Sequence, residues 1–368
     1  MSDKKVTLED LRVQIDSLDQ QIHALLNQRA QVAQKVAEVK LNSVNADERD
    51  GVKFYRPERE AQVLRKVKER NQGPLPDNAV AHIFREIMSA CLALEQPLSV
   101  AYLGPEGTFT HAAAIKHFGH AVLAKPVAAI DQVFSRVASG EDIYGVVPVE
   151  NSTEGMVSHT LDNFMQSDVK ICGEVELPIN LLLLASPKAD KSTIKRICAH
   201  QQALAQCRTW LDNHWPGVER EAVSSNAKAA EMAAKNPSIA AVAGEMAVDL
   251  YDVVTLAEHI QDLSHNTTRF LVIGKEEVAA SGQDKTSIIV SARNIPGALY
   301  ELLEPFHRHQ VMLTRIDTRP SRSENWTYVF FMEFEGHQDD DKIKSILSEL
   351  EERSVMLKVL GSYPKAPL

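Results

Sequence analysis

Apolar residues near the N-terminus recur mainly at spacings of three and four positions. They begin at Leu8 and continue at Leu11, Ile15, Leu18, Ile22, Leu25, Leu26, Val32, Val36 and Val39. This periodicity predicts one long amphipathic helix, with Thr7 as its N-cap and Asp10 in its first turn. A second helix should begin at Pro57, and Asp77 should cap a third. Residues 1–96 are therefore expected to form an all-α domain of three helices.

Beyond residue 96 the pattern changes to short apolar runs that alternate with helical stretches. Ser99–Leu103, residues 145–149 and Arg196–Ala199 are typical of buried strands. The continuous apolar run at residues 181–185 also suits a buried strand. This alternation predicts an α/β domain over residues 97–276.

A third unit follows a segment, residues 276–285, that is rich in Ala, Gly, Ser and charged side chains and is predicted to be a linker. The pattern after it predicts strand, helix, strand, strand, helix and strand. These elements cover residues 287–291, 297–307, 311–318, 326–334, 339–352 and 357–361. Their βαββαβ order indicates a ferredoxin-like layout for a domain over residues 285–365.

Composition narrows the class of protein and its partners. The chain has 368 residues, 44% hydrophobic and 24% charged, which indicates a globular protein of two or three domains. No apolar run is long enough to span a membrane, and a formal charge of -10 argues against nucleic-acid or membrane partners. Residues 1–10 are polar and resemble neither a signal nor a transit peptide, so a cytoplasmic location is expected. The four cysteines form no CxxC pair and lack clustered histidines, so no metal or other cofactor is expected.

Arg29 and Lys40 lie eleven residues apart on the first predicted helix. At 3.6 residues per turn they point in nearly the same direction, about 20° apart, and could serve one site. Arg12 lies roughly 25 Å along the helix from Arg29 and about 100° around it, too far to bind the same small ligand. If the three act together, Arg12 must come from another subunit. A long helix with few partners in its own domain independently favours an intertwined dimer. The alternative is that these cations are solvated charges on a helix face.

The helical segment resembles the all-helical chorismate mutase family. The resemblance rests on Leu11-Arg12, on the pair Arg29 and Lys40, and on the run Arg56-Pro57-Glu58-Arg59-Glu60. It implies that Arg12, supplied across the dimer, and Arg29 bind the two carboxylates of chorismate. Lys40 would donate to the ether oxygen, and Arg59 and Glu60 would contact the ring hydroxyl region. Fixed cations suit this Claisen rearrangement, which needs a compact substrate conformer and positive charge at the breaking ether bond but no covalent catalyst.

This segment departs from the family pattern at three positions. Glu95 stands where many members have Gln as the second donor to the ether oxygen, Cys91 where some have Ser, and Arg56 where some have Asp. A glutamate donates only when protonated, so Glu95 would need a pKa raised above its ordinary value of about 4.3. We therefore predict a mutase activity that is stronger at mildly acidic pH.

Polar loops adjoin several predicted strands of the α/β domain. A glycine-rich turn at residues 104–111 follows the first strand and opens a helix, so its backbone N–H groups could bind an anion. The loop at residues 148–155 follows a later strand, and residues 266–270 lead into another. Taken singly, such loops are usually ordinary turns.

These loops, together with residues 200–207 and 224–226, resemble prephenate dehydratase in order and spacing. The resemblance implies two α/β lobes like those of periplasmic binding proteins, with prephenate in the cleft between them, and it assigns the catalytic hydroxyl to Thr268. The substrate-binding or supporting residues that it implies are Glu150, Asn151, Ser152, Thr153, His200, Gln206, Ser224, Asn226, Arg269 and Phe270. Threonine is a poor acid, so Thr268 is expected to act as a hydrogen-bond donor in a desolvated cleft. His200 is the alternative proton donor.

Two runs in the third unit, residues 294–300 and 313–320, resemble the ACT regulatory domain of prephenate dehydratases. The helix that starts after Gly297 can bind a ligand carboxylate through its free N–H groups, and Leu299 could contact an apolar ring. The resemblance implies a regulatory site for phenylalanine formed by Asn294, Pro296, Gly297, Ala298, Leu299, Asp317, Thr318, Arg319 and Pro320. The alternative is a packing domain without a ligand.

Together the three segments predict a multidomain α and α/β enzyme of phenylalanine biosynthesis. It would convert chorismate to prephenate and prephenate to phenylpyruvate, without metal or coenzyme, as a homodimer or larger homo-oligomer inhibited by phenylalanine. Two alternatives remain open. One is a monofunctional prephenate dehydratase with a vestigial helical dimerisation domain, and the other is a non-catalytic amino-acid sensor.

Overall fold

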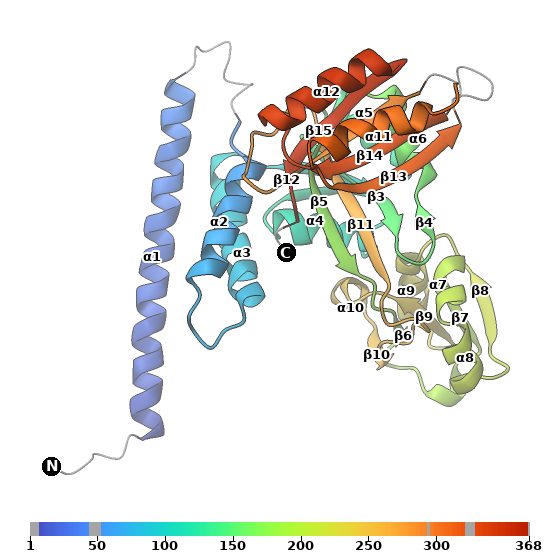
Figure 1. Cartoon of the computed structure of the whole chain (residues 1–368). Helices are drawn as coiled ribbons and strands as arrows, with labels where there is room; N and C mark the ends of the chain where they lie inside the picture. Colours follow the sequence, from blue (N-terminus) through green and yellow to red (C-terminus); the bar gives the residue numbers. More distant parts are fainter. Residues whose placement is uncertain (1–6, 44–52, 293–294, 321–327, 367–368) are drawn as a thin grey trace.

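The computed structural model describes residues 7–43, 53–292, 295–320 and 328–366. Its elements form a helical region, an α/β region built on two sheets, and a C-terminal α/β domain (Figure 1). These three parts correspond to the three predicted segments.

The helical region consists of α1 (Leu8–Asn42), α2 (Pro57–Arg70) and α3 (Asp77–Glu95). The predicted start of α1 is confirmed. Thr7 Oγ1 accepts a hydrogen bond from the backbone N–H of Asp10, and the Asp10 carboxylate accepts one from the backbone N–H of Thr7. This reciprocal capping box satisfies two N–H groups that the helix itself leaves without partners.

The predicted cap of α3 is wrong. Pro76 is the N-cap of α3, and it makes no side-chain capping bond. Asp77 is the first helical residue instead, and its carboxylate accepts a hydrogen bond from the Asn71 side chain at 2.7 Å. Asp77 therefore bonds across the turn between α2 and α3 and does not cap α3.

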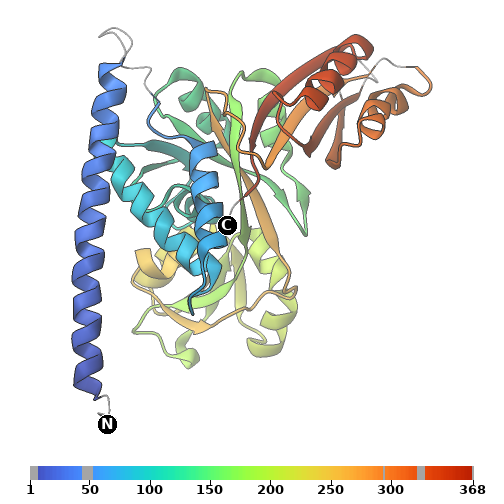
Figure 2. The same ribbon diagram turned by 60° about the vertical axis from the view of Figure 1, so that its left-hand side comes forward.

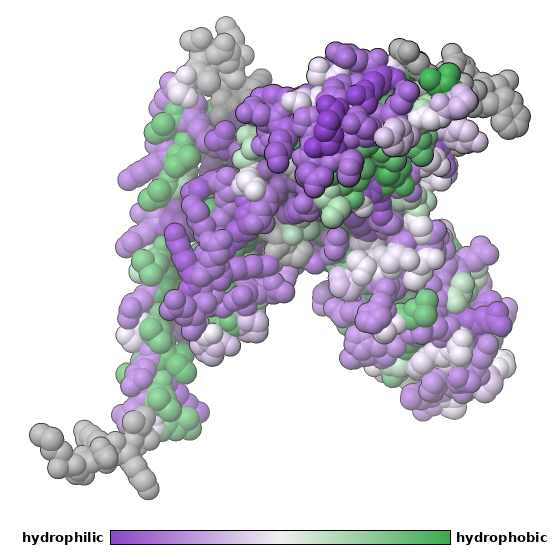
Figure 3. Space-filling view, viewed as in Figure 1, coloured by the Kyte–Doolittle hydropathy of each residue, from purple (hydrophilic) through white to green (hydrophobic). Residues whose placement is uncertain are grey.

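Helix α1 stands as a long rod beside α2 and α3 (Figures 1 and 2). It packs against α3 over part of its length, yet nearly all of its apolar stripe is exposed to solvent. The exposed members are Leu8, Leu11, Val13, Ile15, Leu18, Ile22, Leu25, Leu26, Val32, Val36 and Val39, and they appear as green side chains along the rod in Figure 3. A single chain thus leaves unburied an apolar surface that a stable helix of this length needs to bury.

The first sheet of the α/β region, together with its flanking helices, is called lobe one. It contains β1 (Ser99–Leu103), α4 (Phe109–Phe118), β2 (Leu123–Val127), α5 (Ile130–Ser139), β3 (Tyr144–Asn151), β4 (Gly155–Met156), α6 (Ser158–Gln166), β5 (Lys170–Pro178) and β11 (Thr267–Gly274). The strand order is β2-β1-β3-β11-β5, with β4 paired to β3. Strand β11 runs antiparallel to both of its neighbours.

The second sheet and its helices form lobe two, which the chain enters after β5 and leaves before β11. It contains β6 (Leu182–Ala185), a 3-10 turn (Lys191–Thr193), β7 (Arg196–Ala199), α7 (Gln201–Gln206), α8 (Arg208–His214), β8 (Glu219–Ala222), α9 (Asn226–Lys235), β9 (Ile239–Ala243), α10 (Met246–Leu250) and β10 (Val254–Ala257). Its strand order is β10-β6-β9-β7-β8. The chain therefore crosses between the lobes twice, and residues 266–268 lie on the second crossing.

The C-terminal domain contains β12 (Asp284–Ser291), α11 (Ala298–Arg308), β13 (Leu313–Pro320), β14 (Tyr328–Glu335), α12 (Asp341–Arg353) and β15 (Met356–Pro364). These elements follow the predicted order, strand, helix, strand, strand, helix, strand. They form an antiparallel sheet in the order β13-β14-β12-β15.

One hydrophobic core joins the C-terminal sheet to lobe one. Ile289, Phe331 and Leu360 from the C-terminal strands lie in the same buried cluster as Phe134 and Phe164 from lobe one. The opposite face of the C-terminal sheet packs on α11 and α12. The C-terminal domain therefore packs directly against lobe one through buried side chains, in addition to being covalently linked to it.

The helical region is joined to lobe one by a second buried contact. Tyr55 packs with Phe118 and Tyr144, and its hydroxyl lies 3.1 Å from His117 Nε2. Arg85 of α3 donates to the backbone carbonyls of Lys116 and His117, near the C-terminal end of α4, at 2.7 and 2.5 Å. A cation at a helix C-terminus is favourable because the last carbonyls of the helix carry partial negative charge.

Candidate active sites

The first candidate site lies where α1 packs against α3. Burial raises the pKa of Glu95, while the positive charges of Lys40 and Arg29 act in the opposite direction. Lys40 and Arg29 of α1 are therefore near enough to Glu95 of α3 to affect its ionisation.

Lys40 is held in place by the chain that follows the N-terminal helix. Its ammonium group donates to the backbone carbonyls of Lys53 and Phe54 at 3.1 and 3.3 Å, and it lies 5.4 Å from the centre of the Phe54 ring. Cys91 is buried on α3, one turn before Glu95. Arg12 lies on the same uninterrupted helix as Arg29, so the separation of roughly 25 Å expected from helix geometry applies.

Arg59 and Glu60 differ in their placement. Arg59 is exposed. Glu60 pairs with Arg85 at 3.0 Å in a small buried space that Tyr55 and His117 also line. Burial raises the pKa of Glu60, and Arg85 opposes that effect. In this chain Glu60 therefore lies at the contact with lobe one, and no described interaction joins it to α1.

The second candidate site lies where the two lobes meet. Asn151, the last residue of β3, donates from Nδ2 to Thr268 Oγ1 at 2.8 Å. The backbone N–H of Thr153 donates to Asn151 Oδ1 at 3.0 Å. Because a backbone N–H can only donate, this bond identifies Oδ1 and turns Nδ2 toward Thr268. The hydroxyl oxygen of Thr268 is thus an acceptor from Asn151, which leaves its O–H directed elsewhere.

A chain of amide side chains continues from this pair into lobe two. Asn151 Nδ2 also donates to Asn266 Oδ1 at 2.9 Å, and Asn266 Nδ2 donates to Gln206 Oε1 at 3.1 Å. Gln206 Nε2 in turn donates to Glu154 Oε1 at 3.0 Å. These bonds agree with the orientation that Thr153 sets at Asn151, and they connect that residue to groups from both lobes.

Two members of this chain, Asn266 and Glu154, were not among the predicted site residues. Each lies inside a loop that the sequence singled out, at residues 266–270 and 148–155. The sequence feature that could have identified them is their position close to Thr268 and Asn151 along the chain. Sequence spacing alone does not show that the two loops bond to each other.

The other predicted dehydratase residues surround the network. Ser152 donates its hydroxyl to the carbonyl of His265 and accepts from the backbone N–H of Thr267, and Thr153 Oγ1 donates to Asn151 Oδ1. Asn226 Oδ1 accepts from the backbone N–H of His200 at 2.8 Å. His200 Nδ1 accepts from the backbone of α7 at 3.4 Å, which leaves Nε2 as the proton-bearing nitrogen of the neutral ring. Ser224 is exposed.

Arg269 and Phe270 lie behind Thr268 in the interior. Phe270 is buried in the core of lobe one. Arg269 is also buried and pairs with Glu174 of β5 at 2.8 Å and with Glu333 of β14 at 2.8 Å. Glu150 pairs with Arg315 of β13. Two predicted substrate-binding residues, Arg269 and Glu150, are thus occupied by ion pairs that involve the C-terminal domain.

The predicted regulatory residues divide between two surfaces. Pro296, Gly297 and Leu299 are exposed around the start of α11, and Ala298 is half-buried; Asn294 lies outside the described residues. Thr318 is exposed on one face of β13. Asp317 and Arg319 lie on the other face, where Arg319 donates to Ser158 at 2.8 Å and to Asp162 at 3.0 Å on α6. Burial raises the pKa of Asp317, and Arg315 opposes that effect. Pro320 is the last residue of β13.

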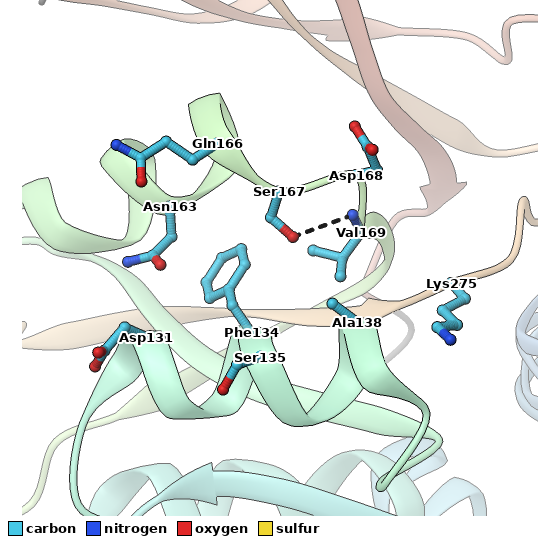
Figure 4. Close-up of a pocket in the computed structure, with 10 residues that line it drawn as sticks. All are labelled: Asp131, Phe134, Ser135, Ala138, Asn163, Gln166, Ser167, Asp168, Val169 and Lys275. Atoms are coloured by element: carbon cyan, nitrogen blue, oxygen red, sulfur yellow. Dashed lines mark hydrogen bonds between the residues drawn. The ribbon is translucent and has the colours of Figure 1, made fainter.

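A separate groove of about 640 Å³ lies between α5 and α6 (Figure 4). Asp131, Phe134 and Ser135 of α5 and Asn163 and Gln166 of α6 line it. Its lining contains none of the predicted site residues, so we assign it no part in catalysis. Within the described part of the chain no three His, Cys, Asp or Glu side chains gather as a metal site requires. No described helix is both long and apolar enough to cross a membrane.

Comparison with known proteins defines the class of each part. The chain matches the models of chorismate mutase type II over residues 11–96, of prephenate dehydratase over residues 100–278, and of the ACT domain over residues 286–352. It is similar to the solved structure of a prephenate dehydratase from Arthrobacter aurescens in complex with L-Phe. That similarity has a TM-score of 0.67 and 34% identity, over 73% of this chain and 90% of the other.

Two relatives match over the whole length. The bifunctional chorismate mutase/prephenate dehydratase of Pseudomonas aeruginosa is 58% identical over 361 residues, which covers 98% of both chains. That of Aquifex aeolicus is 44% identical over 365 residues, covering 98% of this chain and 99% of the other. This chain belongs to the family of bifunctional chorismate mutase/prephenate dehydratases.

Proposed function

We propose that this enzyme converts chorismate to prephenate in its helical domain and prephenate to phenylpyruvate, carbon dioxide and water between its two lobes, under inhibition by phenylalanine. The observation that carries the proposal is the direction of the Asn151–Thr268 bond. Because Thr268 accepts from Asn151, its own O–H group remains able to donate to a ligand at the junction of the lobes. The grouping of Arg29, Lys40 and Glu95 supports the first reaction.

For the mutase reaction, the proposed roles follow the charge that develops as the ether bond breaks. Lys40 donates to the ether oxygen, and protonated Glu95 is the second donor. Arg29 and Arg12 bind the two carboxylates, since guanidinium groups match carboxylate geometry. The cations act by holding the substrate in its reactive conformer and by stabilising developing negative charge.

The mutase site requires a second subunit in this proposal. Arg12 and Arg29 are too far apart on one helix to meet at one substrate. The exposed apolar stripe of α1 supplies a surface for the same dimer. We propose that two chains exchange their long helices, so that Arg12 of one chain completes the site that holds Arg29, Lys40 and Glu95 of the other.

For the dehydratase reaction, Thr268 is proposed to donate a hydrogen bond to the departing ring hydroxyl of prephenate. The bond from the ring to the carboxylate carbon breaks, and its electron pair moves into the ring as carbon dioxide leaves. The ring then expels the hydroxyl group, which departs as water after protonation, and aromatisation drives the step. Lobe one and lobe two form a cleft of the periplasmic-binding-protein kind in this proposal, which would exclude water and strengthen the bond from Thr268. His200, with Nε2 bearing a proton, is the second candidate donor.

Phenylalanine is proposed to bind beside the start of α11. Gly297, the N-cap of α11, has a positive φ of 85° and makes no side-chain capping bond. The N–H of Ala298 donates to the carbonyl of Ile295, so the N–H groups of Leu299 and Tyr300 in the first turn are the ones proposed to bind a carboxylate. Exposed apolar residues, Ile295, Leu299, Tyr300, Met312 and Ile316, lie on or beside α11 and β13, where Figure 3 shows a green patch. We assign the domain a ferredoxin-like topology, which its strand order supports. A cytoplasmic location stays a prediction from the sequence.

A single assay tests the proposal. Purified protein given chorismate should form prephenate and then phenylpyruvate, and added phenylalanine should slow the second product. Thr268→Ala should lower phenylpyruvate formation to a small residual rate while prephenate accumulates. If chorismate is unchanged, the helical domain serves only dimerisation; if neither substrate reacts, the protein is a sensor. Dehydratase turnover that stays at the parental rate in Thr268→Ala would exclude the assigned role of this hydroxyl.

A further inference from the structure

Strands β3 and β11 carry the Asn151–Thr268 bond on one face and two ion pairs on the other. In their antiparallel register Thr268 lies opposite Asn151, and Arg269 lies opposite Glu150. Successive side chains of a strand point to opposite faces of its sheet. The side chains directly behind the bonded pair therefore point toward the C-terminal domain, and both contact it.

The first contact is a buried cluster around Arg269. Its guanidinium donates to Glu174 at 2.9 Å, to Glu333 at 3.0 Å and to the Tyr363 hydroxyl at 3.2 Å. Lys285 pairs with the same Glu174 at 2.8 Å, so two cations balance two carboxylates. Three of these groups, Lys285, Glu333 and Tyr363, belong to the C-terminal domain. A buried arginine held by this many partners has little freedom to move.

The second contact joins Glu150 to Arg315 of β13. Arg315 also lies 3.5 Å from Asp317 on the same strand. Four positions farther along β13 from Arg315, Arg319 binds Ser158 and Asp162 of α6. Strand β13, at the edge of the C-terminal sheet, therefore contacts lobe one at two places. One of them is Glu150, the residue next to Asn151.

The strands are irregular at this place, which makes outside support important. The register shifts just after Arg269, because Phe270 lies opposite Pro148 rather than Val149. A bulge of this kind interrupts the ladder and bends the strand, and bulges often orient side chains beside active sites. The shift in register therefore lies directly beside the Arg269–Glu150 pair, whose two side chains make the ion pairs with the C-terminal domain.

We propose that Glu333 and Arg315 of the C-terminal domain are positioning residues for the dehydratase reaction, acting through Arg269 and Glu150 on the hydrogen bond between Asn151 and Thr268. The inference rests on the proposed role of Thr268. These ion pairs connect the regulatory domain directly to the dehydratase site. Any shift of β13 or β14 relative to lobe one would move Glu150 or Arg269, which are the neighbours of Asn151 and Thr268.

The test compares two matched variants of the full-length enzyme. Glu333→Gln removes the charge that holds Arg269. Glu349→Gln removes a carboxylate that pairs with Arg308 and Arg353 within the C-terminal domain, away from lobe one. We expect Glu333→Gln to lower the dehydratase kcat by roughly tenfold or more, because small displacements of reacting groups are costly. The KM for prephenate and the mutase rate should stay within about twofold of the parent, and Glu349→Gln should change neither.

A double variant separates positioning from a general loss of structure. If Glu333 acts through Thr268, Glu333→Gln should not slow a Thr268→Ala enzyme further, since the bond it supports is already gone. An equal loss in both backgrounds would overturn the inference, as would a Glu333→Gln kcat within about twofold of the parent.

Arg315 provides the second test. Its pair with Glu150 is less buried than the cluster around Arg269, so a substitution there is less liable to cause misfolding. Arg315→Gln should lower kcat, and Arg315→Lys, which keeps the charge, should recover part of it. An Arg315→Gln enzyme with parental kcat would contradict the inference for this residue. If Thr268→Ala itself leaves dehydratase turnover unchanged, the proposed function of Thr268 fails instead, whatever the ion-pair variants do.

Discussion

Asn151 donates from Nδ2 to Thr268 Oγ1 at 2.8 Å, although 117 positions separate the two residues in the chain. The direction of this bond follows from the backbone N–H of Thr153, which occupies Asn151 Oδ1. Since Thr268 accepts from Asn151, its own O–H is free to point at a ligand.

The isosteric change Asn151→Asp tests this direction. A carboxylate can only accept, so the Thr268 hydroxyl would turn to donate to Asp and would be lost to the substrate. We expect the dehydratase kcat to fall by about 10²–10³, as when one preorganised donor is removed, with the mutase rate unchanged. Asn163→Asp, in the groove between α5 and α6, is the matched control and should leave both rates near parental values. A dehydratase rate kept by Asn151→Asp would show that the direction of the bond is immaterial.

Glu95 should make the mutase rate depend on pH. Burial raises the pKa of this carboxyl group, even though Lys40 and Arg29 act against it. Glu95 can donate only below its pKa, so the donor is lost as the pH rises through that raised value. Mutase rates measured from about pH 5 to pH 8 should therefore decline toward neutral pH. The rate of Glu95→Gln, whose amide donates at every pH, should be nearly flat. A flat profile for the parent, or equal slopes for both proteins, would exclude this role.

Subunit complementation tests whether Arg12 acts across a dimer. Arg12→Ala and Lys40→Ala should each be inactive as mutases when purified alone. If the site combines Arg12 of one chain with Lys40 of the other, one of the two sites in a mixed dimer is intact. Co-expression in equal amounts should then restore about a quarter of parental mutase activity, because half of randomly assorted dimers are mixed. Arg12 acting within its own chain would give no recovery, and dehydratase activity serves as the internal control.

Gly361 should be essential for docking the C-terminal domain. It has a positive φ of 149°, and a Cβ built on it would lie 2.4 Å from the backbone carbonyl oxygen of Ile171 in β5. Gly361→Ala must therefore push β15 away from lobe one. Gly282→Ala is the matched control, since Gly282 also has a positive φ, 92°, but a Cβ there meets nothing within 4 Å. We expect Gly361→Ala to lower the free energy of unfolding by about 3 kcal/mol or more and Gly282→Ala by about 1–2 kcal/mol. Equal thermal denaturation midpoints would contradict the expectation.

Local signals in the sequence were sufficient for many of the elements. The three- and four-residue spacing predicted α1, and Thr7 was predicted as its N-cap. The continuous apolar run at residues 181–185 predicted the buried strand β6, and alternating strands and helices predicted the order of the C-terminal domain. Each of these depends on interactions within a few residues, which sequence spacing records directly. Asp77 shows the limit, because its carboxylate bonds to the side chain of Asn71 across the preceding turn and does not cap α3.

Periodicity and turn residues act locally, so they were enough to predict the three-part organisation, most helices and strands, and the loops that contain the proposed site residues. The partners of those loops became known from the folded structure alone. It joined Asn151 by hydrogen bonds to a chain formed by Asn266, Gln206 and Glu154, and it placed Arg269 in a buried ion cluster with the C-terminal domain. An ion pair or a chain of amide hydrogen bonds depends on which distant strands lie side by side. The sequence around a charged residue does not show whether its partner is a substrate or another strand.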